Sequence, residues 1–143
     1  MPRFESLNQG ERAWVADNIA QACALAKKYG GDPETSESAS LAALDRVWYL
    51  FTANLRETGA DPNRVINMIG LAFGHHLVTA CDLSWVVATD EHGTEIALHA
   101  QPGDILIYPT NLVAKRWTAR EGAFMEKLFV QIETDIARIR SAR

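Results

Sequence analysis

Apolar residues recur at helical spacing in most of the chain and at alternating spacing in one central segment. Residues 9–29, 37–58 and 121–140 each carry an apolar stripe along one helical face. Gly30 and Gly31 are expected to end the first of these helices, because glycine readily adopts the left-handed backbone of a C-cap. Gly59 is expected to end the second, whose N-cap lies among Ser36, Ser38 and Ser40.

A third helix differs because it is apolar on nearly every side. Asp61 is a favourable N-cap and Pro62 a favourable first helical residue, so the helix is expected to start there. An all-round apolar helix belongs in the middle of the packing. Gly70 and Gly74 lie one turn apart on it, which predicts a close approach of another backbone or, alternatively, a kink or break at Gly70.

The segment after this helix predicts three strands, at residues 84–90, 95–100 and 105–108, with turns at 91–94 and 101–104. In the second turn, Pro102 and Gly103 occupy the central positions of a type II turn. Pro109 is expected to end the third strand. Thr110 would then cap a short helix that reaches Trp117.

Strand register follows from the placement of the two turns. Centring the first on His92 and Gly93 sets Val87 opposite Leu98, and centring the second on Pro102 and Gly103 sets Leu98 opposite Ile107. One face of the sheet then carries the large apolar side chains Trp85, Val87, Ile96, Leu98, Ile105 and Ile107. The second face is mixed and carries Val86, Ala88, Asp90, Glu95, Ala97, His99, Leu106 and Tyr108.

These elements predict an α+β fold, with helices packed around a three-stranded antiparallel β-meander, in a single domain spanning residues 1–143. The net charge of −4 disfavours nucleic acid as a partner. No apolar run approaches the roughly 20 residues of a membrane span. The N-terminus has no secretory pattern, so we expect a cytoplasmic protein in which Cys23 and Cys81 are reduced and buried.

Candidate chemistry is sparse. Adjacent His75 and His76 point about 100° apart on a helix, and HExxH and paired-cysteine ligand spacings are absent, so we expect neither a metal nor a cofactor. Nucleophile and phosphate-loop motifs are also missing, and no catalytic residue is assigned. Asp90 and Glu95, opposite each other in the expected register, offer only a weak paired-carboxylate signal.

The second sheet face is the candidate binding surface. His99 lies on its central strand with Tyr108 diagonal to it, and Asp90 and Glu95 form an acidic edge. Two further pairs of residues are candidates: Glu91 and His92 in the adjoining turn, and Lys115 and Arg116, which have the charge to hold an anion. If no helix covers the face, it is a groove for a ligand or a peptide. The favoured expectation is that one of the last two helices covers it and leaves His99 buried and hydrogen-bonded.

Several short motifs resemble a bacterial family known as domain of unknown function 3806. They are AFG at 72–74, WVV at 85–87, DExGT at 90–94, AL at 97–98, Pro109 and VAKR at 113–116. The resemblance covers about residues 65–120 and excludes the first two helices. At the position after AFG, which is often acidic in the family, this chain has His75. The resemblance implies a bacterial origin and an α+β module, but no activity and no catalytic residues.

The leading functional expectation is a non-catalytic protein-binding module. One form of it, by analogy with small acidic bacterial proteins, is an immunity protein that neutralises a cognate toxin. The alternative is a small-molecule-binding or enzymatic domain that uses the sheet face around His99 and Tyr108. A third reading, a purely structural subunit, predicts an obligate oligomer, and the sequence leaves the oligomeric state open.

Overall fold

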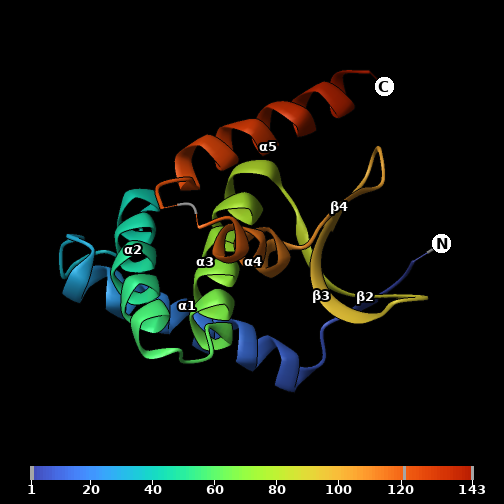
Figure 1. The fold of residues 1–143 in the computed structure, drawn as a ribbon. Coiled ribbons are helices and arrows are strands. Elements are labelled where there is room, and N and C mark those ends of the chain that lie inside the picture. The colour runs from blue at the N-terminus through green and yellow to red at the C-terminus, as the bar shows by residue number, and fades with distance from the viewer. Residues whose placement is uncertain (1, 121, 143) are drawn as a thin grey trace.

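The computed structural model describes residues 2–120 and 122–142. Helices form most of the molecule, and the strands lie at one end of it (Figure 1). The elements in chain order are β1 (Arg3–Ser6), α1 (Gln9–Tyr29), α2 (Leu41–Thr58), α3 (Asn63–Cys81), β2 (Ser84–Asp90), β3 (Gly93–Ala100), β4 (Ile105–Ile107), α4 (Pro109–Ala119) and α5 (Met125–Ser141).

Helix α3 occupies the middle of the packing, as its apolar sequence predicted. It packs against α1, α2, α4 and α5. Its side chains Ile69, Phe73 and Leu77 are fully buried. A helix surrounded on all sides has no face to present to water, which explains why its sequence lacks a polar stripe.

The two glycines of α3 lie where neighbouring segments press against the helix. A Cβ at Gly70 would lie 2.6 Å from the Cα atom of Thr110, so another backbone does approach closely there. At Gly74 the neighbours are side chains instead, since a Cβ would lie 2.6 Å from Cη2 of Trp85 and 3.0 Å from Cγ of Pro109. Helix α3 runs without interruption through both glycines, so the alternative of a break at Gly70 is wrong.

The sheet has four antiparallel strands within the described residues, in the order β1-β2-β3-β4. The expectation of three strands missed β1, which pairs with β2 and places Phe4 opposite Ala88. The strand RFES has a single apolar residue, so its sequence carries no alternating pattern from which a strand is recognised. The α+β class is unchanged by this addition.

The expected register holds for one hairpin and is wrong by two residues for the other. Leu98 lies opposite Ile107, as predicted. In the first hairpin, however, Val87 lies opposite Ile96, because the turn centres on Glu91 and His92 and pairs Asp90 with Gly93. Since the side-chain period of a strand is two, the shift leaves every residue on its predicted face.

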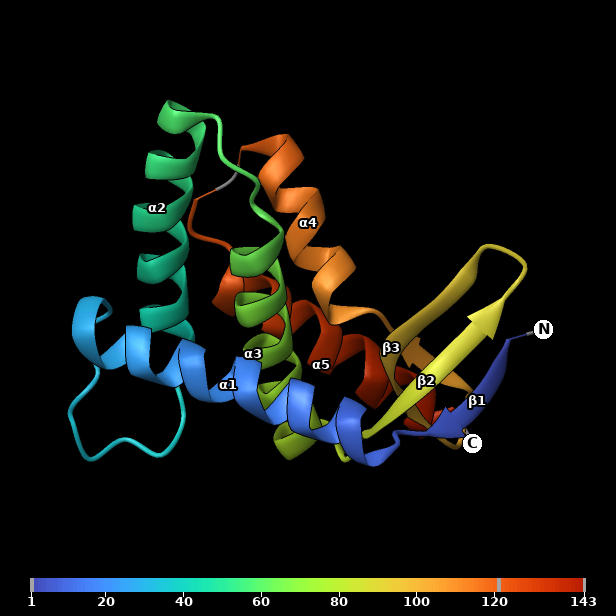
Figure 2. The ribbon, with the colours of Figure 1, turned by 90° about the horizontal axis from the view of Figure 1, so that it is seen from below.

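Figure 1 shows the sheet as a curved band with the helices on its convex side, and Figure 2 shows the same separation from below. The convex side is the apolar face, since the Trp85 ring reaches Gly74 of α3 and Leu98 is fully buried. The concave side carries the mixed second face of the sheet.

Two helix starts differ from the prediction for identifiable reasons. Helix α2 begins at Leu41 rather than at residue 37, because Asp32 accepts bonds from the backbone N and the hydroxyl of Ser40 and holds the preceding residues as a loop. Ser40 is the N-cap. Helix α3 has Pro62 as its N-cap residue, although Asp61 still accepts a hydrogen bond from the Asn63 N–H at 3.0 Å.

The start of α4 also differs, because Pro109 is its first residue and Tyr108 its N-cap residue, so Thr110 does not cap it. The last helix was expected to start at Glu121, which lies outside the described residues. Helix α5 begins at Met125, after a non-helical stretch at residues 122–124.

Both ends of α5 take part in caps that join it to other elements. Its start has no side-chain cap of its own. Instead, the Asp45 carboxylate of α2 accepts hydrogen bonds from the backbone N–H groups of Phe124 and Met125, at 2.9 and 3.1 Å. At the other end, the Arg140 guanidinium donates to the carbonyls of Cys81 and Asp82, where α3 ends.

Both cysteines are free; Cys81 is buried, as predicted, and Cys23 is only half-buried. Among residues 2–120 and 122–142, no helix has the combination of length and hydropathy that a membrane crossing requires.

Candidate functional site

The concave face of the sheet is closed at one end by an aromatic side chain and open at the other. In Figure 1 the described helices lie on the other side of the sheet, and only the start of α4 reaches this face, at its edge beside Glu95. The expectation that one of the last two helices covers the face is therefore wrong, although His99 is mostly buried and hydrogen-bonded as expected. The ring of Phe4, from β1, instead stacks on His99 with ring centroids 4.2 Å apart. The strand that the sequence did not reveal therefore provides the cover.

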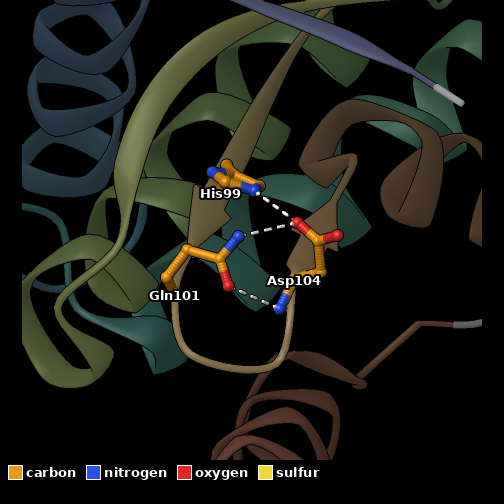
Figure 3. Close-up of polar contacts among 3 residues, drawn as sticks. All are labelled: His99, Gln101 and Asp104. Atoms are coloured by element: carbon orange, nitrogen blue, oxygen red, sulfur yellow. Dashed lines mark hydrogen bonds and ion pairs between the residues drawn. The ribbon is translucent and has the colours of Figure 1, made fainter.

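His99 is held in this closed end by a polar network at the β3–β4 turn (Figure 3). His99 Nε2 lies 3.1 Å from Oδ1 of Asp104, and the same oxygen accepts from Nε2 of Gln101 at 3.0 Å. The Gln101 side-chain oxygen in turn accepts the backbone N–H of Asp104 at 3.1 Å. Asp104 and Gly103 both have positive φ, so these bonds stabilise a tight turn, and His99 serves the fold here.

The open end of the face is a pocket of about 250 Å³ between the β2–β3 hairpin and the start of α4. Strand β4 pairs only with residues 98–100, which leaves the outer edge of residues 93–97 next to α4. Thr110 Oγ1 donates to Oε1 of Glu95 across this junction, at 3.3 Å. The pocket is lined by Ala88, Asp90, His92, Gly93, Thr94, Glu95, Tyr108 and Asn111.

The pocket contains the carboxylates of Asp90 and Glu95 and the phenol of Tyr108. Burial raises the pKa of Tyr108 above its ordinary value of 10.0, and the Asp90 and Glu95 carboxylates raise it further. At neutral pH the Tyr108 hydroxyl is therefore protonated and able to donate. The Asp90, Glu95 and Tyr108 side chains all line this one pocket.

Asp90 and Glu95 do not form the cross-strand pair that the sequence predicted. In the observed register Asp90 faces Gly93 and Glu95 faces Ala88. The Asp90 carboxylate accepts the backbone N–H of His92 at 2.8 Å and thereby supports the hairpin turn. The two acids still line one pocket, because the two-residue shift kept both on the concave face.

The remaining predicted residues are distributed around the pocket or away from it. Glu91 is highly exposed beside His92 and lines no part of the pocket. Lys115 lines a neighbouring hollow, which shares Tyr108 and Asn111 with the acidic pocket. Arg116 lies with its guanidinium carbon 5.7 Å from the centre of the Phe124 ring, where it packs against the core.

Asn111 is the polar lining residue that the sequence did not single out. Pro109 could have indicated that Asn111 lies near Tyr108. With Pro109 at the first position of a helix, Asn111 falls in the first turn, beside Tyr108. Placing the helix start at Thr110 obscured this relationship.

Within the described ranges 2–120 and 122–142, no group of three or more His, Cys, Asp or Glu side chains lies close enough to hold a metal ion. His76 is half-buried, contacts the carbonyl oxygen of Ala39 at 2.5 Å and packs edge-on against Phe129, so it has a structural role at the boundary of the core. His75 faces a different cavity, lined mainly by α1.

Comparison with known proteins gives the family of this sequence. The family model described as domain of unknown function (DUF3806) matches residues 52–129, more than half of the chain. The chain belongs to the DUF3806 family. The DUF3806 match begins within α2, earlier than the resemblance at residues 65–120 suggested, and it contains every residue that lines the acidic pocket.

The fold is also similar to a solved structure. A crystal structure of a protein from Bacteroides thetaiotaomicron VPI-5482 matches 92% of this chain with a TM-score of 0.65 and 11% sequence identity. This chain spans 47% of the length of that protein, so the likeness concerns the fold of about half of it. No curated protein matches the sequence.

Proposed function

We propose that this chain is a non-catalytic binding module that accepts a basic side chain of a protein partner in the acidic pocket. The observation that supports this most directly is the presence of two carboxylates, from Asp90 and Glu95, beside Tyr108 in a pocket whose described lining residues include no lysine or arginine. A lysine or arginine head group brings the complementary charge, and arginine also brings donors for both acids.

The size of the pocket supports a side chain rather than a larger ligand. Its volume of about 250 Å³ falls below the roughly 300–1,000 Å³ of typical small-molecule sites. The exposed Glu91 at the rim and the net charge of −4 extend the negative field around the entrance, which favours encounter with a basic protein surface. A toxin with such a surface, neutralised by this chain, is one partner of this class.

The alternative that relied on His99 has weaker support. The His99 ring is stacked on Phe4 and engaged with Asp104, and it lines no part of the pocket that contains Tyr108. A reaction that used both groups would require them to face one substrate.

Nuclear magnetic resonance titration with N-acetyl-arginine amide and N-acetyl-lysine amide tests the proposal. We expect backbone amide shifts confined to the residues around the pocket, such as Thr94, Glu95 and Asn111. The neutral N-acetyl-glutamine amide should produce none of them. Exposed ion pairs contribute roughly 1 kcal/mol or less, so Glu95→Gln should weaken binding by up to about fivefold.

The control for total charge is Glu57→Gln, which removes one exposed acid from α2 and lies outside the pocket. Its affinity for the arginine probe should equal that of the wild type. Equal losses in the two variants, or shifts scattered over the whole surface, would show non-specific attraction and contradict the proposal.

A further inference from the structure

A second cavity, independent of the acidic pocket, lies along α1. It has a volume of about 480 Å³, well within the range of small-molecule sites. Its walls are largely apolar and come from α1, from the segment that precedes it and from the start of β2. The apolar side chains that form them include Leu7, Val15, Ile19 and Trp85.

The end of this cavity at the start of α1 carries the cation of Arg12, which has no acidic partner among the described residues. The Arg12 guanidinium donates through Nη1 to the carbonyl oxygen of Leu7 at 2.6 Å, which fixes its position. Among residues 2–120 and 122–142, Arg12 forms no ion pair, and the remaining donors of its planar fork are available. Arginine presents such donors in the geometry that a carboxylate accepts.

His75 adds a second polar group to the same cavity. Its ring forms no hydrogen bond with any residue that the structure describes, whereas the neighbouring His76 is engaged with Ala39. One acid, Glu37, also lines the cavity, and it continues with Cys23 into an adjacent hollow. Cys23 lies about three helical turns from Arg12, so the acid and the cation belong to different ends.

We infer that this cavity binds a small amphiphile, with an apolar body along α1 and a carboxylate head group against Arg12. Burial of the ligand body against the apolar walls contributes to the binding free energy, at roughly 25 cal/mol for each Å² of apolar surface removed from water. Arg12 supplies the charge-assisted hydrogen bonds that orient the head group, and the free His75 ring supplies a further donor. Glu37, at the other end, disfavours the reversed orientation.

Calorimetric titration of the full chain with sodium decanoate, kept below its micelle concentration, tests this inference. We expect saturable one-to-one binding, and displacement by decanoate of the fluorescent sulfonate 1-anilinonaphthalene-8-sulfonate. Arg12→Gln should weaken decanoate binding about tenfold, because it removes the charged partner of the head group. Decyltrimethylammonium, which has the same chain and a cationic head, should bind far more weakly.

A pair of matched variants on α1 separates occupancy of the cavity from general effects on the helix. Ala20 lines the cavity and Ala13 does not, and both are exposed, so leucine at either position should leave the fold intact. Ala20→Leu should abolish decanoate binding by filling the site, and Ala13→Leu should leave it unchanged.

Three results would overturn the inference. They are the absence of decanoate binding to the wild type, equal binding of the cationic analogue, and equal effects of Ala13→Leu and Ala20→Leu. A variant that fails to fold is recognised from its circular dichroism and is replaced by Ala16→Met, since Ala16 also lines the cavity.

Discussion

At the scale of single residues, Asp45 joins two helices that are far apart in the chain. Its carboxylate belongs to α2, yet it accepts the first backbone N–H groups of α5, which has no side-chain cap of its own. Burial raises the pKa of Asp45 above its ordinary value of 3.8, while the two backbone hydrogen bonds oppose that rise and nearby Glu126 adds to it. The folded state therefore holds the proton of Asp45 more tightly than the unfolded state does.

This difference predicts a pH dependence with a defined sign. As pH rises above 3.8, the unfolded chain releases the Asp45 proton first, so this residue's contribution to stability falls until the raised folded pKa is passed. Asp45→Asn keeps an acceptor but cannot titrate. The free energy of unfolding of Asp45→Asn should therefore rise relative to the wild type over that interval, as measured by urea denaturation at a series of pH values.

Asp45→Ala provides the comparison, because it removes the cap altogether. We expect it to lose about 1–2 kcal/mol of stability on both sides of the titration. If the difference between wild type and Asp45→Asn were constant with pH, the inferred shift in the pKa of Asp45 would be wrong.

At the scale of elements, α3 and the start of α4 can lie in close contact because Gly70 has no side chain. The space that a Cβ of Gly70 would fill is taken by the backbone of Thr110. Alanine at position 70 would gain about 1 kcal/mol in helix propensity but would force the two segments apart. We expect Gly70→Ala to lower the free energy of unfolding by about 2 kcal/mol in chemical denaturation.

The matched control is Gly10→Ala in α1. A Cβ there would meet Asn8 Oδ1 at an ordinary distance of 3.5 Å, so the propensity gain should appear without a clash. Gly10→Ala should be neutral or stabilising by up to about 1 kcal/mol. A stabilised Gly70→Ala would show that the two helices can separate without cost.

The elements that the sequence revealed are those whose pattern is local. The apolar periodicity of α3, the glycines that end α1 and α2, and the second hairpin, where the Pro102–Gly103 turn fixes Leu98 opposite Ile107, were all predicted correctly. The first hairpin was shifted because glycine at 93 suggested a turn centre, whereas it is the first residue of β3. The assignment of residues to the two sheet faces was still correct, because the register was wrong by two residues and side chains alternate between the faces with a period of two.

What the sequence did not reveal depends on contacts between distant segments. Strand β1 exists because it pairs with β2, about eighty residues later in the chain, and not because of its own composition. Asp45 becomes a cap only when α2 and α5 meet. The sequence placed Asp90, Glu95 and Tyr108 on one sheet face, where they line the acidic pocket, but no local signal connected Phe4 to His99 at the other end of that face.

At the scale of the whole molecule, the helices pack on one face of the sheet (Figure 2), and on the other face the Phe4 ring of the edge strand β1 stacks on His99. Phe4→Ala removes the stacking with His99, and we expect it to lower the free energy of unfolding by about 2 kcal/mol. This value lies between the contribution of an aromatic pair and that of a fully buried aromatic ring. Amide hydrogen exchange should accelerate in β1 and in the facing part of β2.

The helices should be unaffected by this change, because none of their described cores contains Phe4. Exchange in α3 should therefore keep wild-type protection apart from any effect of the lower global stability. Arg3→Ala, on the same strand but outside the aromatic stack, should leave exchange in β2 unchanged. If amide exchange accelerated equally in both variants, the cause would be any substitution in β1 and not the loss of the stacking between Phe4 and His99.

The absence of a side chain at Gly70 also has a consequence for recognition. Thr110 presses on α3 at that point, and two residues that line the acidic pocket lie close to it in the chain, Tyr108 two positions before it and Asn111 directly after it. These residues are thereby anchored to the most buried helix of the molecule before any partner arrives. A basic side chain that enters the pocket meets a pre-organised receptor, so little conformational entropy is lost from the protein when the complex forms.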